Sequence, residues 1–347
     1  MPFVSNILRH KSLSIVGLEK NTGKTECLNY VLRRLAEKGV PCAVTSIGVD
    51  GEQTDSVYAT AKPEITLYEG MRFITSEKHY LQRQLVSQLI EADTQSTALG
   101  RLVTAEVLCR GKVLLSGAAT TAKLQEQIAR QVEMGVPLTI VDGALSRLSL
   151  ASPTVTEAMI LATGAAVSPN VQQLVSKTRF VCRLIALEEV EPALRERLAP
   201  IEKGLHAVDD EGAVHDLGIA SVFLLGRSET NLYSHGSTFF ASGAVGDQLL
   251  RYLAAQKEVA RTVLIVRDFT KLFITADALA AYTRKGGQLK VLQQSRLLAV
   301  CLNPTSPQGY RLNSKEACRV LSEALEMPVY DIKDPEIASG SAKPNLK

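Results

Sequence analysis

Short apolar runs rich in Val, Ile and Leu alternate along this 347-residue chain with longer stretches in which apolar residues recur at helical spacing. This alternation is typical of βαβ units, because each buried parallel strand needs a helix to return the chain. The first run, Leu13–Val16, precedes a segment whose Leu28, Val31, Leu32 and Leu35 share one helical face. The pattern predicts an α/β fold with a mostly parallel sheet and helices on both faces.

The same reading places further elements along the chain. Strands are expected at residues 41–47, 112–116, 138–141, 159–163, 222–225, 263–266, 297–302 and 329–330. Helices are expected at 187–198, 247–255, 276–284 and 314–325. The segments 206–208 and 213–215 flank an acidic turn that ends in Gly212, which predicts a β-hairpin.

The length of 347 residues corresponds to about two domains. We expect residues 1–204 to form a first domain and residues 205–333 a second α/β domain that opens with the hairpin. Residues 334–347 hold no large apolar cluster and are expected to form a loose tail.

The overall composition excludes several classes of partner. A formal net charge of +3 and 5% aromatic residues do not suit a protein that binds nucleic acid by neutralising phosphates. No apolar run approaches the length of a membrane helix, and residues 1–10 lack the apolar block of a signal peptide. The six cysteines include no CxxC pair, which favours reduced, mostly buried thiols. We expect a cytoplasmic protein.

The strongest motif is the loop from Gly17 to Thr25, which lies between the first strand and the first helix and ends in Gly23-Lys24-Thr25. In such a loop, backbone amides and the positive end of the helix surround phosphate, the Lys meets the outer phosphates and the Thr holds magnesium. Five residues separate Gly17 from Gly23, one more than in the usual P-loop pattern. The residues expected to bind nucleotide are Gly17, Lys20, Asn21, Thr22, Gly23, Lys24, Thr25 and Glu26.

A second candidate feature is the apolar strand that ends in Asp142. P-loop proteins place a strand-end carboxylate beside magnesium and its water, although strand-end Asp residues also cap helices. We expect Lys24 and Asp142 to be catalytic, with Thr25, Asp50 and Asp142 as magnesium ligands. Asp50 and the nearby Asp55 could instead stabilise the turn in which they lie. Lys20 and Arg147 could either contact phosphate or simply be exposed to solvent.

Other signatures are missing from the sequence. It contains no Gly-x-Gly of a dinucleotide fingerprint, no HExxH and no GxSxG. It also lacks an Asn-Lys-x-Asp motif, so ATP and GTP are not distinguished. The loops at 242–247, 267–268 and 303–307 follow expected strands or open helices, where they either line a ligand site or form ordinary turns.

The spacing of the loop resembles that of dethiobiotin synthetase and its relatives, and Asp142-Gly143-Ala144 is similar to their Glu-Gly-Ala segment. This resemblance implies a P-loop NTPase fold with ATP and Mg²⁺ as cofactors. It implies an ATP-dependent ligase or kinase acting on a small carboxylate or amine. Dimers are common in this branch, so the resemblance leaves a homodimer open.

Over most of the chain, the order of motifs is similar to that of reactivating accessory proteins of adenosylcobalamin-dependent aminomutases. The segments concerned are 23–25, 45–52, 142–144, 163–165 and 303–309. This resemblance implies a nucleotide-driven factor whose partner is an aminomutase, with any contact to cobalamin made through that partner. Because a bare ligase needs only the first ~200 residues, the remaining length favours the accessory function.

Overall fold

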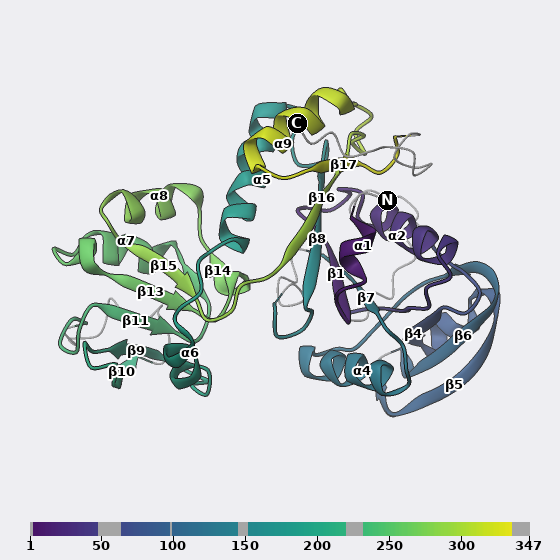
Figure 1. Cartoon of the computed structure of the whole chain (residues 1–347), viewed down its shortest axis with the longest axis horizontal. Coiled ribbons are helices and arrows are strands. Elements are labelled where there is room, and N and C mark those ends of the chain that lie inside the picture. The colour runs from purple at the N-terminus through teal and green to yellow at the C-terminus, as the bar shows by residue number, and fades with distance from the viewer. Residues whose placement is uncertain (1–2, 48–63, 98, 145–151, 220–231, 335–347) are drawn as a thin grey trace. The chain divides into compact units, whose positions relative to one another are not determined.

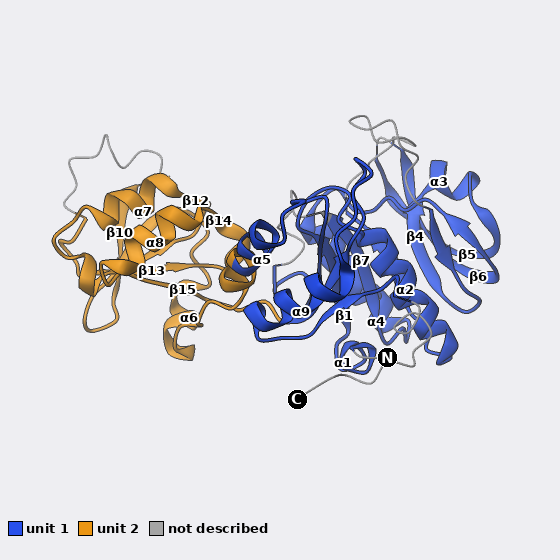
Figure 2. Ribbon diagram, turned by 90° about the horizontal axis from the view of Figure 1, so that it is seen from above, with its two compact units in different colours: residues 1–179, 297–347 blue, residues 180–296 orange. Residues whose placement is uncertain are grey.

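The computed structural model describes residues 3–47, 64–97, 99–144, 152–219 and 232–334 (Figure 1). The chain divides into two compact units, one made of residues 1–179 and 297–347 and the other of residues 180–296 (Figure 2). The smaller unit is therefore an insertion in the larger one. The expected boundaries at 204 and 333 are replaced by crossings after Arg179 and before Leu297.

The larger unit contains a ten-stranded sheet in the order β17-β16-β8-β1-β7-β2-β4-β6-β3, with β5 paired to β6. Its strands are β1 (Ser12–Gly17), β2 (Ala43–Ser46), β3 (Ile65–Leu67), β4 (Arg72–Ser76), β5 (Gln84–Thr97), β6 (Gly100–Val113), β7 (Thr139–Ala144), β8 (Ala158–Gly164), β16 (Leu297–Asn303) and β17 (Val329–Asp331). Pairing is parallel from β17 to β4 and antiparallel wherever β6 takes part. The expected α/β class and mostly parallel sheet are confirmed.

Consecutive core residues of the sheet face different helices. Ile140 on β7 packs in one apolar cluster with Leu28 and Leu32 of α2 (Lys24–Glu37). The next residue, Val141, belongs to a separate cluster with Leu124 of α4 (Thr121–Glu133). Because neighbouring residues of a strand point to opposite faces, helices cover both faces of the sheet.

The long antiparallel hairpin of β5 and β6 differs from the sequence-based expectation. A parallel strand was expected at residues 112–116, but β6 ends at Val113 and runs antiparallel to both β4 and β5. The hairpin itself was not predicted, because every position of β5 is exposed or half-buried and the strand therefore has no buried apolar run to signal it. Helices α1 (Val4–Ile7), α3 (Glu77–Leu81) and α9 (Ser314–Leu325) complete the larger unit, together with α5 (Val171–Ile185), which continues into the smaller one.

The smaller unit is built on a five-stranded mixed sheet in the order β10-β9-β11-β13-β15. The expected hairpin is confirmed, since β9 and β10 pair antiparallel. The elements are α6 (Pro192–Leu198), β9 (Leu205–Val208), β10 (Val214–Ile219), β11 (Thr238–Ala241), β12 (Val245–Gly246), α7 (Asp247–Ala254), β13 (Val263–Val266), β14 (Leu272–Phe273), α8 (Ala276–Arg284) and β15 (Gln288–Val291), with short 3₁₀ helices at Val259–Arg261 and Phe269–Lys271.

Two expectations for this region need correction. The strand at 297–302 was assigned to the second domain, yet β16 pairs with β8 in the large sheet. The helix expected from residue 187 begins at Pro192, because proline suits the first turn of a helix and not its interior. The expected strand at 222–225 and the tail beyond 334 lie outside the described residues. Among the residues that are described, no helix has both the length and the apolar character needed to cross a membrane.

Candidate functional site

The loop between β1 and α2 has the backbone shape of an anion-binding turn. Asn21 and Gly23 adopt left-handed conformations, with φ of 62° and 86°. The first helical hydrogen bond of α2 runs from the Cys27 amide to the Gly23 carbonyl. The amides of Lys24, Thr25 and Glu26 therefore precede the helical pattern, where they add to the positive end of the helix dipole.

Two glycines allow the loop to close. A Cβ atom on Gly17 would lie 2.6 Å from the hydroxyl of Thr22, and one on Gly23 would lie 2.7 Å from Cβ of Asn303. The Thr22 hydroxyl also donates to the Glu19 carbonyl over 2.9 Å, which folds the loop back on itself. Any larger residue at Gly17 or Gly23 would push the loop apart.

Asp142 reaches the loop because β7 lies beside β1. Ile15 on β1 is in register with Asp142, and Lys24 Nζ lies 3.1 Å from Asp142 Oδ1. That oxygen is buried and accepts no hydrogen bond from the described residues, so its contact with the ammonium group is electrostatic. Both predicted catalytic side chains therefore meet at one edge of the sheet.

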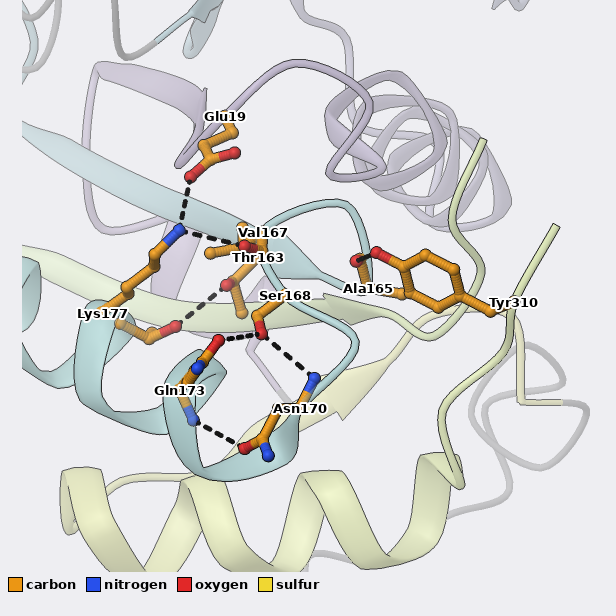
Figure 3. Close-up of polar contacts among 10 residues, drawn as sticks. Glu19, Thr163, Ala165, Val167, Ser168, Asn170, Gln173, Lys177 and Tyr310 are labelled. Carbon is orange, nitrogen blue, oxygen red and sulfur yellow. Dashed lines mark hydrogen bonds and ion pairs between the residues drawn. The ribbon is translucent and has the colours of Figure 1, made fainter. Parts of the chain in front are cut away.

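Asn303, at the end of β16, contacts the same turn, and the segment that follows β8 contacts Asn303. The side-chain amide of Asn303 donates to the Asn21 carbonyl over 3.3 Å, and the Asn303 carbonyl accepts from the Ala165 amide. The Tyr310 hydroxyl donates to the Ala165 carbonyl over 2.6 Å (Figure 3). Because β1, β8 and β16 are parallel neighbours, their carboxyl ends bring these segments together.

Lys177 on α5 holds the loop from another side. Its ammonium group lies 3.3 Å from Glu19 Oε1 and donates to the Val167 carbonyl over 3.1 Å (Figure 3). Behind it, the buried hydroxyls of Thr163 and Thr178 are joined over 2.9 Å. Sequence reasoning missed Lys177 and Tyr310, because a single charged or aromatic residue far from the motif has no local signal.

The other expected site residues divide into two groups. Lys20 and Thr25 belong to the loop, and so does Glu26, whose carboxylate pairs with Lys333 at 3.3 Å so that only its backbone is available to the loop. Asp50, Asp55 and Arg147 lie outside the described residues.

The polar loops of the smaller unit are occupied by internal contacts. Asp268 accepts hydrogen bonds from the amide and hydroxyl of Thr270. Arg267 donates to the carbonyls of Ala199 and Ile201, and Ser242 donates to that of Gly204. These contacts favour the interpretation of both loops as structural turns, in contrast to the loop at Asn303.

The loop supplies oxygen atoms of the kind that magnesium prefers. Asp142 provides a buried carboxylate oxygen that accepts no hydrogen bond from the residues the structure describes, and Thr25 provides a hydroxyl at the start of α2. Within the described ranges, no group of three or more His, Cys, Asp or Glu side chains could hold a metal ion. A magnesium ion here would need oxygens from a bound phosphate as well.

Comparison of this chain with protein-family models, with curated proteins and with solved structures found no match.

Proposed function

We propose that the chain binds ATP with magnesium at the loop of residues 17–25 and hydrolyses it slowly. The observation that carries this proposal is the 3.1 Å contact between Lys24 Nζ and Asp142 Oδ1. It joins the lysine of the Gly-Lys-Thr triplet to a strand-end carboxylate from a distant part of the sequence. A P-loop NTPase fold is part of the proposal, and the position of β1 between β7 and β8 supports it.

Each residue has a distinct role in this proposal. The amides at the start of α2 would bind phosphate oxygens, and Lys24 would exchange its contact with Asp142 for the outer phosphates. Asp142 would then face the magnesium ion and its water, together with the Thr25 hydroxyl. Magnesium would neutralise charge on the phosphates.

The unit of residues 180–296 favours a nucleotide-driven accessory factor, which we propose acts on an adenosylcobalamin-dependent aminomutase. This unit has its own sheet and its own apolar cluster around Phe240 and Ile265. The smaller unit is connected to the larger one through α5 at its start and β16 at its end. Both of these elements contact the loop of residues 17–25, α5 through Lys177 and β16 through Asn303. A ligase or kinase acting on a small carboxylate or amine is the alternative function.

Nucleotide binding is tested by calorimetry with Mg-ATP on the full chain and on Lys24→Ala. Loss of one charge-assisted contact to phosphate should weaken binding by roughly 100-fold. Lys38→Ala, at the exposed far end of α2, is the matched control and should bind like the unmodified chain. Circular dichroism should show that both variants are folded. Equal affinity in Lys24→Ala and the unmodified chain would refute the proposal.

Stimulation of phosphate release separates the two functions. An accessory factor should respond to an aminomutase and not to small molecules, whereas a ligase or kinase should respond to a small carboxylate or amine alone. Faster phosphate release with a panel of such small molecules, and none with an aminomutase, would decide for the alternative.

A further inference from the structure

Exposed apolar side chains are concentrated in one segment of the larger unit. Seven large apolar residues are exposed among the described residues, and five of them lie between α3 and the middle of β6. Their exposed fractions run from 39% to 79%, and the residues are Leu81, Val86, Leu89, Ile90 and Leu108. Apolar side chains this exposed within one helix and hairpin indicate a surface that another protein covers.

The backbone of β5 adds a free sheet edge to this surface. Among the described strands β5 pairs only with β6, whose other side pairs with β3 and β4. Gln84 pairs with Lys112 and Leu89 with Ala105. Five steps along β5 therefore correspond to seven steps along β6. The additional residues of these register shifts are on β6, so β5 is regular from Gln84 to Leu89 and able to pair on its outer side. The next shift, between Leu89 and Glu91, places its additional residue, Ile90, on β5, so the regular edge ends at Leu89.

The charges around this stretch identify the occupant. Residues 84–90 carry no charge, Arg83 precedes them and Glu91 follows them. Two antiparallel copies of the strand would bring Arg83 of each near Glu91 of the other, whereas parallel copies would bring like charges together. An uncharged edge with opposite charges at its two ends is thus complementary to itself in the antiparallel direction.

We propose that β5 pairs antiparallel with β5 of a second copy of this chain, joining the two large sheets into one. Main-chain hydrogen bonds between residues 84–89 of the two copies would hold the strands together. Val86 and Leu89 would lose water at the contact. This dimer does not depend on nucleotide binding.

The mass of the full chain, measured by light scattering and sedimentation between about 1 and 100 μM, tests the proposal. The unmodified chain should be dimeric at the upper concentrations. Val86→Lys should weaken the dimer at least about 10-fold, because a lysine at the edge must lose its hydration on pairing. Phe273→Lys, at a comparably exposed apolar residue of the smaller unit, should leave the dimer unchanged. A chain that is monomeric throughout, or a dimer that Val86→Lys leaves intact, would overturn the proposal.

The antiparallel arrangement is tested by exchanging charges. Arg83→Glu and Glu91→Arg should each weaken the dimer about 2- to 5-fold, since each places like charges opposite one another. The double variant should recover the affinity. Within one copy Arg83 donates to Ser87 and Glu91 pairs with Arg130, and the double variant restores neither contact. Recovery therefore reports on the contact between copies, and a double variant weaker than both single ones would overturn the arrangement.

Discussion

At the scale of single residues, the site depends on one carboxylate oxygen, Asp142 Oδ1, that accepts no hydrogen bond from the described part of the chain. This oxygen is buried and lies 3.1 Å from the Lys24 ammonium nitrogen. Burying a charge with a single partner is costly unless the site gains from it. Under the proposed function, the benefit is a carboxylate already positioned to bind magnesium and the water attached to it.

Replacement of this carboxylate should separate binding from hydrolysis. Asp142→Asn keeps the size of the side chain and leaves Lys24 free for phosphate, so Mg-ATP should still bind in calorimetry. Phosphate release should fall roughly 100-fold, because the amide cannot organise magnesium and water. Asp277→Asn on α8 is the control and should hydrolyse normally. A variant of Asp142 with full phosphate release would remove this residue from the mechanism.

At the scale of elements, packing decides the chemistry of the thiols. Cys42, just before β2, packs in the apolar cluster between the large sheet and α2, and burial raises its pKa to about 12. Cys109 lies exposed on β6. The sequence led us to expect mostly buried thiols, and three of the six, Cys27, Cys42 and Cys301, are buried. Cys182 and Cys318 are half-buried, and Cys109 is exposed because the hairpin leaves its position uncovered.

The raised pKa of Cys42 predicts a loss of stability in alkali. In the unfolded chain the thiol ionises near 9.0, whereas in the fold it stays protonated to about 12. The unfolded state binds fewer protons in that window, so the free energy of unfolding falls as pH rises above 9, by about 1.4 kcal/mol per pH unit for this thiol. Urea unfolding at several pH values should give a smaller alkaline slope for Cys42→Ala and an unchanged slope for Cys109→Ala. Equal slopes in all three chains would contradict the assignment.

At the scale of the whole molecule, the larger unit is made from two separate parts of the chain. β16 pairs with β8 from Leu297 to Asn303, and its Ala299 and Cys301 belong to the same apolar cluster as Leu28 of α2. A sheet that loses β16 also loses the Asn303 contact with the loop. Residues 1–204 are therefore an incomplete domain.

Fragments should show this dependence directly. Residues 1–204 should unfold without a cooperative thermal transition, because the edge of β8 that pairs with β16 in the full chain is left unpaired. Residues 180–296 have their own sheet and should unfold cooperatively in isolation. Circular dichroism melting of both fragments and the full chain measures this. A fragment 1–204 that melts as sharply as the full chain would contradict the division into units.

Spacing along the chain was enough to predict the loop, most of the parallel strands and the helices at 276–284 and 314–325, both confirmed to the residue. These features have local causes: helical spacing, caps, and glycines where the backbone turns. The sequence also predicted Lys24 and Asp142 as residues of one site, whereas their 3.1 Å contact required β7 to pair with β1.

The return of β16 to the large sheet and the contacts of Lys177 and Asn303 with the loop had no such local cause. Each depends on which strands become neighbours, and that choice is made by contacts between residues far apart in the sequence. In the sequence, the segment around Asn303 looks like an ordinary turn rich in Asn and Pro. It reaches Asn21 because β16 pairs with β8, and β8 with β1, in one continuous parallel sheet.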